Sequence, residues 1–411
     1  MKHHTIISLF ALIFFSVGNG QTINVCKDCP ISDLAIAIEL AQNNDTIVVS
    51  NDITTNKPIR INKNLTLIGN EYPIMDGMNE HEILTVQTDS FTIKGFKFQN
   101  VGQSFTKDHA AIRLIKSKKF KIESNQFENV YYGIFLEKCS KGLIKNNIIK
   151  GNATVEYKSG NGIHLWHCNN ITIDNNKVSN VRDGIYFEFV DHSNVINNSS
   201  HDNLRYGLHF MFSNEDRYEN NIFERNGAGV AVMFSKKISM HENKFLKNWG
   251  TASYGLLLKE IYDAEITRNT FEKNTIGINA EGSNRIEYLG NNFIENGWAV
   301  KILGACFDNN FTKNNFLNNT FDVAYSGRLN NNSFENNYWG EYSGYDLDKN
   351  GIGDVPHRPV KLFSYIVNQS PESIILLRSL MIDVLNFSEK VSPIFTPTDL
   401  YDSKPLMKKA L

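Results

Sequence analysis

The sequence predicts an all-β fold, a single-stranded right-handed parallel β-helix, on three observations. An asparagine returns about every 22 residues through the middle of the 411-residue chain. Apolar residues lie three positions before most of these asparagines and two positions after them. A short strand led by glycine follows in each repeat. Self-similarity at a fixed period of this length indicates a solenoid, which can absorb the length of the chain in one body. The asparagines are Asn125, Asn147, Asn176, Asn198, Asn221, Asn243, Asn269, Asn291, Asn314 and Asn332.

Each repeat holds two or three short strands rather than a helix, because none shows a 3.6-residue period. Side chains alternate along a strand, so the second and fourth residues after each glycine share one face. Stacking in register places equivalent strands side by side in parallel, about 4.8 Å apart. The turn asparagines can then form amide ladders. The repeated glycines are Gly133, Gly162, Gly184, Gly207, Gly229, Gly255 and Gly277, and weaker earlier repeats lie at 65–67, 91–98 and 111–114.

The two ends of a solenoid need caps. Residues 21–60 form the predicted N-terminal cap and first strands, with a helix that Ser32 and Asp33 open and that runs to Gln42. The β-helix is expected over 61–340, followed by an Asp/Gly-rich loop and connector over 341–370. A second helix is expected over 371–390, with Ser370 as N-cap and an apolar stripe of Ile374, Leu377, Met381 and Leu385. Residues 391–411 are expected to be extended or disordered.

Residues 1–20 have the composition of a secretory signal peptide. Lys2 precedes an apolar run too short to span a membrane, and small residues lead to a cleavage site near Gly20. The sequence therefore predicts an exported, soluble protein. The net charge of −2 gives no indication of a nucleic-acid partner.

The five cysteines include a C-x-x-C pair, Cys26 and Cys29. In an oxidising compartment a local disulfide is its simplest interpretation, and a redox or metal role is the alternative. Cys139 and Cys168 both lie six residues after their glycines, so they should be stacked neighbours. A disulfide, a soft-metal pair and inert packing all remain open for them.

Two predicted outward columns carry metal-binding side chains. The second residue after glycine gives His164 and His209, and the fourth gives Glu188, Met211 and Met233. Imidazole with thioether is a ligand set of copper, and methionine favours Cu(I). The alternatives are a face that uses large residues for cover, or a surface for another protein.

A calcium loop is a further candidate. Asp346, Asp348, Asn350 and Asp354 place oxygen donors at positions one, three, five and nine, with Gly351 at six. Position twelve is His357 rather than the expected glutamate, so an Asp/Gly-rich turn is the alternative.

A carbohydrate-active β-helix enzyme or a sugar-binding module is the second functional reading. Such an enzyme needs two carboxylates at catalytic separation, or a basic residue beside carboxylates. The available groups form no repeated acidic cleft; they are Asp183, Glu188, Asp191, Asp202, His192 and His201.

The chain resembles the NosD family, both in the repeats and in the tail. In the repeats the resemblance lies in the segments 162–167, 183–187, 206–213 and 229–235, which include two Met-Phe-Ser triplets. In the tail it lies in Asn337-Tyr-Trp-Gly340, in the Asp/Gly-rich loop and in Pro356-x-Arg358-Pro359. The Asp-Pro-His-Asp motif of alginate epimerases is absent.

The resemblance implies a periplasmic, non-enzymatic protein that assists copper-centre maturation in nitrous oxide reductase. It implies as partners an ABC transporter permease and ATPase, a copper-carrying lipoprotein and the reductase itself, and hence association with the inner membrane. The predicted helix from Pro371 to Phe387 is the expected docking element for the permease, because its apolar stripe lies outside the repeats.

Overall fold

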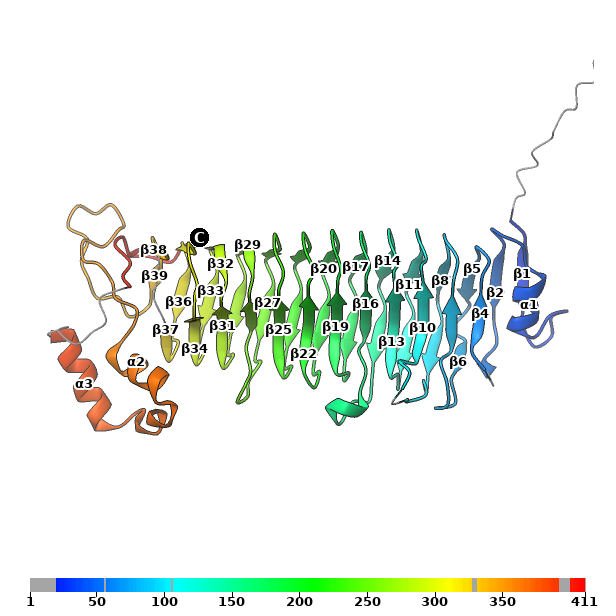
Figure 1. Ribbon diagram of the computed structural model, residues 1–411, viewed down its shortest axis with the longest axis horizontal. Helices are drawn as coiled ribbons and strands as arrows, with labels where there is room; N and C mark the ends of the chain where they lie inside the picture. The colour runs from blue at the N-terminus through cyan, green and yellow to red at the C-terminus, as the bar shows by residue number, and fades with distance from the viewer. Residues whose placement is uncertain (1–19, 55–56, 105, 327–330, 392–399, 411) are drawn as a thin grey trace, which may run out of the picture.

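A computed structural model describes residues 20–54, 57–104, 106–326, 331–391 and 400–410, and for Ile53, Thr54, Lys390 and Val391 the backbone alone. The described chain forms one long stack of coils with helices at both ends (Figure 1). Three parallel sheets, A, B and C, run the length of the stack, which confirms the predicted parallel β-helix. The expected signal peptide lies outside the described residues, apart from Gly20.

Sheet A holds 14 of the described strands. They are β1 (Thr22–Val25), β2 (Thr46–Val49), β5 (Thr66–Gly69), β8 (Thr92–Lys94), β11 (Lys121–Glu123), β14 (Leu143–Lys145), β17 (Thr172–Asp174), β20 (Asn194–Ile196), β23 (Arg217–Glu219), β26 (Ser239–His241), β29 (Tyr262–Thr267), β32 (Asn284–Leu289), β35 (Asn310–Thr312) and β38 (Ser333–Glu335).

Sheet B holds 13 of the described strands. They are β3 (Ile53–Thr54), β6 (Ile74–Asp76), β9 (Lys97–Gln99), β12 (Gln126–Glu128), β15 (Ile148–Lys150), β18 (Lys177–Ser179), β21 (Ser199–His201), β24 (Ile222–Glu224), β27 (Lys244–Leu246), β30 (Thr270–Glu272), β33 (Asn292–Ile294), β36 (Asn315–Leu317) and β39 (Tyr338–Trp339).

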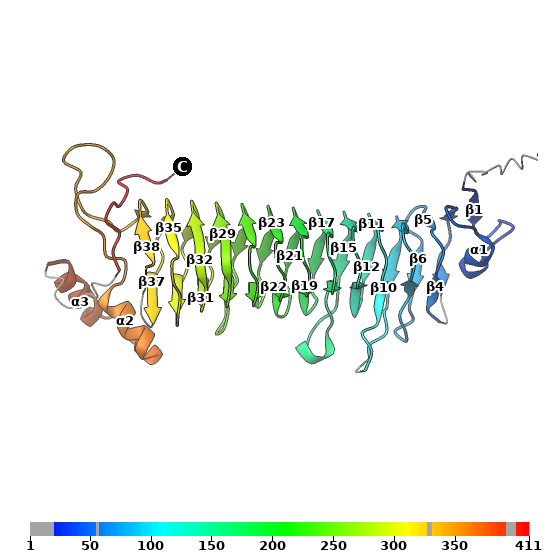
Figure 2. The same ribbon diagram turned by 45° about the horizontal axis from the view of Figure 1, so that its top comes forward.

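Sheet C holds 12 of the described strands and carries the candidate site. They are β4 (Ile59–Ile61), β7 (Leu84–Val86), β10 (Ala110–Ile115), β13 (Tyr132–Glu137), β16 (Ile163–Trp166), β19 (Asp183–Glu188), β22 (Tyr206–Met211), β25 (Ala228–Met233), β28 (Leu256–Lys259), β31 (Ile276–Glu281), β34 (Trp298–Leu303) and β37 (Phe321–Ser326). Figure 2 shows these strands as successive parallel arrows, with the loop before β16 projecting from the stack.

The buried asparagine ladder holds successive coils in register. Asn198 illustrates the pattern: its backbone N–H and its side-chain amide both donate to the Asn221 Oδ1, at 2.9 and 3.1 Å. The same amide also donates to the carbonyl of Ile173, a coil away. The ladder runs from Asn125 to Asn337, and a second one runs from Asn203 to Asn319 along another turn. Buried turn amides are thereby satisfied at every coil.

Cys139, Cys168 and Cys306 are buried free thiols, so of the three alternatives left open for Cys139 and Cys168 the disulfide is not formed. Their side chains point into the interior from one column of turn positions, and several other coils hold serine at the equivalent position. The Cys168 sulfur accepts from the backbone N–H of Cys139 (3.4 Å), as the Ser213 hydroxyl accepts from that of Val190 (3.1 Å). Each cysteine therefore does the hydrogen-bonding work that serine does in other coils.

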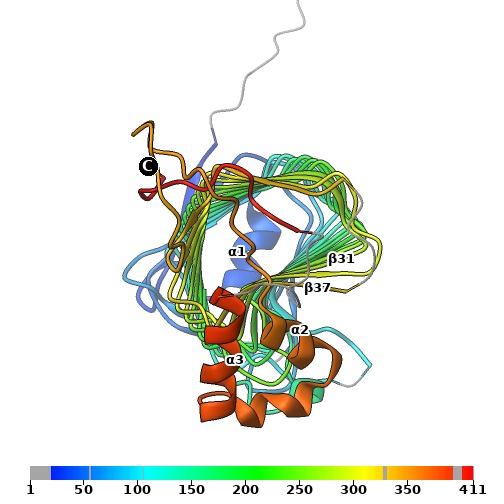
Figure 3. The same cartoon turned by 90° about the vertical axis from the view of Figure 1, so that its left-hand side faces the viewer.

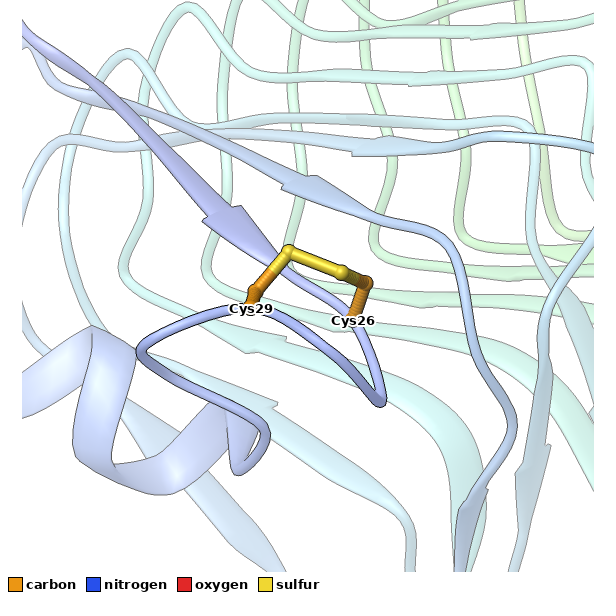
Figure 4. The surroundings of a disulfide bond; sticks show 2 residues. All are labelled: Cys26 and Cys29. Atoms are coloured by element: carbon orange, nitrogen blue, oxygen red, sulfur yellow. A yellow bond between two sulfur atoms is a disulfide. The ribbon is translucent and has the colours of Figure 1, made fainter.

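The N-terminal cap agrees with the prediction. Helix α1 (Leu34–Leu40) begins at Asp33, whose carboxylate accepts from the backbone N–H groups of Ala35 and Ile36. Leu34, Ala37 and Ile38 bury against the end of the core, and the helix ends two residues before the predicted Gln42. Cys26 and Cys29 form the local disulfide in the turn between β1 and α1 (Figure 4).

The C-terminal helical region differs from the prediction of one helix over 371–390. The structure has α2 (Leu362–Gln369), a 3₁₀ turn η2 (Pro371–Leu376) and α3 (Leu380–Val391). Ser370 ends α2 and makes no side-chain cap to η2. The helical conformation is interrupted at Leu377 and Arg378, and the φ of Arg378 is 70°. The predicted stripe is therefore split. Leu377 and Leu385 pack inward with Phe363 and Trp298, whereas Met381 is exposed.

The described end of the tail, residues 400–410, returns to the solenoid. Asp402 is fully buried, and its backbone forms isolated β-bridges with Phe334 and His357. Its Oδ2 accepts from the backbone and side chain of Asn337 and from the Trp339 indole, at 3.0 to 3.1 Å. The tail thus closes the asparagine ladder, a role that the expectation of an extended or disordered end missed.

Candidate metal-binding face

The predicted outward columns exist, and both lie on sheet C. The register pairs Tyr186 with His164 on one side and with His209 on the other. The second column runs, through the same pairings, from Glu137 to Trp166, Glu188, Met211, Met233 and Lys259. Residues between the columns, such as Leu165 and Phe210, point into the core. His164 and His209 therefore share one wall, as the sequence predicted.

His164 lies in an aromatic stack. Its ring packs between those of Phe135 and Tyr186, at centroid distances of 4.4 and 4.6 Å. The Asn161 Nδ2 donates to its Nδ1 at 3.0 Å. Burial, with the nearby charges of Arg182 and Arg113, lowers the pKa of His164 to about 3. Since Nδ1 has a partner, only Nε2 remains to bind an ion.

His209 is the more deeply covered histidine, at 4 % exposure. Its ring meets Tyr186 edge-on at 5.0 Å and lies 4.8 Å from the ring of Tyr206. Neither ring nitrogen has a hydrogen-bond partner in the part of the chain that the structure describes. Burial, together with Arg205 and Arg182, lowers the pKa of His209 to about 4. The ring is therefore neutral near pH 7, with a lone pair available to a metal.

The cover over this face was not foreseen from the sequence, which placed both histidines on an exposed wall. The loop before β16 folds toward β22, and its Glu156 pairs with Arg205 at 3.4 Å. Arg182 pairs with the buried Asp183, whose second oxygen has no partner among the described residues. Burial raises the pKa of Asp183. The single sequence signal was the alternation of bulky aromatic residues with histidine in one column.

The five candidate residues do not surround one point. Tyr186 stands between His164 and His209, which lie two rungs or roughly 10 Å apart. Met211 and Met233 are direct Cα partners, and Met211 follows His209 by two residues on the same face of β22. Glu188 is the partner of Met211 on the other side. The structure therefore groups His209, Met211 and Met233, and sets His164 apart.

The described residues hold no group of three or more His, Cys, Asp and Glu side chains arranged for a metal ion. Beside His209, the potential ligands are the sulfur atoms of Met211 and Met233. A His209–Met211–Met233 group has one imidazole and two thioethers, which suits a soft monovalent ion better than a hard divalent one.

The carboxylates of the 346–354 loop are engaged by the loop itself. The Asp346 oxygens accept from the backbone N–H groups of Asn350 (3.1 Å) and Gly351 (2.8 Å), and Asp354 accepts from that of Leu347 (2.7 Å). The Asp348 Oδ2 accepts from the side-chain amide of Asn350 at 2.8 Å. These bonds fit the Asp/Gly-rich turn, and calcium at this loop stays a prediction.

The carboxylates considered for an enzyme site are dispersed. Asp183 begins β19 and Glu188 ends it. Asp202 pairs with Arg225 and His201, and His192 pairs with Glu215. Asp191 accepts from Asn214 in a turn. Asp191, Asp202 and His192 thus belong to pairs along the turns, whereas Asp183 is buried within sheet C.

A comparison with known protein families finds a match that covers most of the repeats. The model of a family described as "Periplasmic copper-binding protein (NosD)" matches residues 77–156 and 145–344, which together exceed half of the chain. This chain belongs to the NosD family. The match covers every strand that carries the candidate copper residues.

Two similar relatives are both named "Probable ABC transporter binding protein NosD". The protein from Pseudomonas aeruginosa is 29 % identical over 355 residues, covering 81 % of this chain and 82 % of the relative. The protein from Stutzerimonas stutzeri is 26 % identical over 375 residues, covering 82 % and 80 %. No helix of the described residues is long and apolar enough to cross a membrane.

Solved structures with a similar fold include carbohydrate-active proteins. A PL6 alginate lyase in complex with a trisaccharide matches with a TM-score of 0.55 and 11 % identity, covering 79 % of this chain and 86 % of the lyase. The A-module of the Azotobacter vinelandii mannuronan C-5 epimerase AlgE6 gives 0.51 and 12 %, covering 74 % and 89 %. At these identities the likeness concerns the fold alone.

Proposed function

We propose that this protein is a periplasmic accessory factor that handles copper for the assembly of the copper centre of nitrous oxide reductase, together with an ABC transporter. Membership of the NosD family supports the copper and periplasmic parts of this proposal. The names of the relatives support the transporter part. A copper-carrying lipoprotein that delivers the ion completes the proposed set of partners.

His209 is the observation that carries the copper proposal. A buried polar group without a partner costs free energy, so its persistence calls for a ligand. Its lowered pKa keeps the imidazole neutral, which is the form that binds a metal. Met211 and Met233 lie beside it on the same face and are only partly buried, so thioether sulfur is within reach of an ion arriving from solvent. Such a set favours Cu(I) over harder ions.

A competition titration tests this assignment. Purified protein is titrated against a chromophoric Cu(I) chelator, and His209→Ala and Met211→Leu are compared with wild type. We expect each change to weaken the Cu(I) affinity by at least about tenfold, because each removes one of three ligands. His201→Ala, at an exposed ion pair, and Met78→Leu, at a distant exposed turn, are the matched controls. Equal affinity in all five proteins would refute the assignment.

The C-terminal helices support the transporter part of the proposal. Helix α2 is anchored on the outer face of sheet C by Phe363 and Val367, which pack against Trp298 and Phe321. Ile382 of α3 buries in the same cluster. The opposite side of α3 stays open: Leu380, Val384 and Phe387 are 79, 55 and 68 % exposed. A helix fixed at one side and apolar at the other is suited to docking on a permease.

Point changes on α3 test this docking better than a truncation. Deleting the residues after Ser370 also removes Asp402 and Ile382, so it disturbs the solenoid's own cap. We expect Phe387→Glu to abolish co-purification with the permease and to leave the thermal unfolding midpoint within about 2 °C of wild type. Asp383→Lys, an exposed change on the same helix, serves as control. Undiminished co-purification of Phe387→Glu would contradict the docking role.

A further inference from the structure

An exposed strip of aromatic side chains runs along the corner at which the strands of sheet C end. His167, Phe189, Phe212 and Phe234 directly follow β16, β19, β22 and β25. Successive rings stack at centroid distances of 4.6, 5.2 and 5.2 Å, with planes 7 to 11° apart. The three phenylalanines are 39, 39 and 44 % exposed. We refer to these four residues as the phenylalanine strip.

The fold does not itself require phenyl rings at these positions. All four residues have φ between 51 and 55°, a left-handed conformation that is unfavourable for a bulky side chain. Equivalent turn positions in other coils hold lysine, glutamate or glycine: Lys116, Lys138, Glu260, Gly282 and Gly304. Beside the strip lie the partly buried Trp166, Met211 and Met233. A contiguous apolar surface of this kind marks an interaction site.

The geometry favours a protein over a sugar or a bilayer. Sugars stack on the faces of aromatic rings, but here each inner face is covered by the next ring. The ring edges that remain suit aliphatic and aromatic side chains. Interfacial membrane anchors bury their apolar face several ångströms deep. Rings that are more than half covered by their own wall cannot insert in that way.

The charges at the two ends of the strip are complementary to each other. Lys138 precedes the strip and Glu260 follows it in the same turn position. In the neighbouring column, Glu137 precedes Trp166 and Lys259 follows Met233. Reversing the strip end for end therefore exchanges the charges of the two flanking coils for their opposites, while Glu188 in the neighbouring column comes to face Met211. Self-complementarity under reversal is the property of an isologous two-fold interface.

We propose that the phenylalanine strip is a self-association surface on which a second copy of this chain docks antiparallel. A two-fold axis in the interface, level with the midpoint between Phe189 and Phe212, keeps each column facing itself and reverses its order. Lys138 of one copy then faces Glu260 of the other, and Glu137 faces Lys259. A copy docked in the same direction would instead bring the lysine-rich first coils together. Those coils carry the exposed Lys116, Lys118, Lys119, Lys138 and Lys141.

The surface is accessible and small. Viewed along the stack in Figure 3, α2 and α3 lie below the solenoid and the C-terminal segment lies at the upper left, away from the corner near the β31 and β37 labels. The four coils of the strip and the two flanking coils with Lys138 and Glu260, spaced about 4.8 Å apart, together span roughly 24 Å. A patch of this length and only two side chains wide offers much less area than the roughly 800 Å² per partner of stable complexes, so the dimer is weak and concentration-dependent.

Analytical ultracentrifugation of the metal-free mature protein tests the proposal. We expect a monomer–dimer equilibrium with a dissociation constant on the order of 10–500 µM, weakening as salt rises. Phe212→Asn should weaken it at least tenfold, because asparagine keeps the left-handed turn and removes the ring. Tyr157→Ser, at an exposed aromatic residue on the loop before β16, is the control and should change nothing.

Charge exchange tests the antiparallel arrangement. Lys138→Glu and Glu260→Lys should each weaken the dimer at least tenfold, and the double variant should restore it. A protein that stays monomeric at about 500 µM overturns self-association and leaves the strip to a different protein. A dimer that the double variant does not restore overturns the antiparallel docking. Because metal is absent throughout, neither result bears on the copper proposal.

Discussion

At the residue scale, His209 shows what the sequence could and could not predict. Its column, its face and its neighbours Met211 and Met233 followed from counting residues after each glycine. Its burial did not follow, because Tyr186 of the preceding coil packs against the ring and the loop before β16 reaches Arg205 through Glu156. When residues distant in the sequence bury a side chain, the sequence around that side chain does not indicate its burial. The column read from the sequence already placed Tyr186 between His164 and His209, and grouping the two histidines as one patch overlooked that separation.

The pH dependence of stability follows from the pKa of His209. The folded value of about 4 lies below the unfolded value of about 6.5, so the unfolded chain takes up the proton first. The contribution of His209 to the free energy of unfolding is present above pH 6.5 and is lost as the pH falls toward 4. Between pH 7.5 and 5 the loss is about 2 kcal/mol. Urea unfolding of wild type and His209→Gln at both pH values measures it, and the variant should show a smaller pH effect.

At the element scale, the asparagine ladder explains why the period of the sequence was informative. Each ladder asparagine accepts hydrogen bonds from the coil before it and donates hydrogen bonds to the coil after it, so few other residues can replace it. The period was therefore visible without coordinates. The C-terminal helices carry no such constraint. There, one apolar stripe was compatible with a single helix, whereas the structure divides it between residues packed near Trp298 and Phe321 and residues that stay exposed.

A single change in the ladder should be costly. Asn221→Ala removes the acceptor of the Asn198 backbone and side-chain amides and the donor to Val195. We expect a loss of roughly 2–4 kcal/mol, because buried N–H groups are left without partners. Asn220→Gly, at the neighbouring exposed left-handed position, is the control and should lose less than about 1 kcal/mol. Equal urea midpoints for the two variants would contradict the role of the ladder.

At the scale of the whole molecule, the solenoid is closed at both ends by elements outside the repeats. Helix α1 covers the first coil, and Asp402 completes the last hydrogen bonds of the ladder. The N-terminal cap was predictable from its capping residue and amphipathic pattern. The C-terminal closure was not predictable, because a single aspartate in a proline-containing tail belongs to no sequence pattern from which its contacts could be inferred.

Removing the C-terminal closure should loosen one end only, since the coils of a solenoid interact mainly with their neighbours. In Asp402→Ala, we expect the amides of β38 and β39 to exchange at least tenfold faster with solvent deuterium, and those of β22 to be unchanged. Asp402→Asn, which keeps an acceptor oxygen for Asn337, should lie close to wild type. Uniform acceleration along the whole stack would contradict local closure.

X-ray absorption spectroscopy of the Cu(I)-loaded protein tests the central claim most directly, namely that the register of the coils builds a copper site from His209, Met211 and Met233. The account predicts mixed nitrogen and sulfur ligation in wild type. His209→Ala should lose the nitrogen contribution, Met233→Leu should lose one sulfur, and His201→Ala should match wild type. Ligation without methionine sulfur, or a spectrum unaltered by the first two changes, would contradict the account.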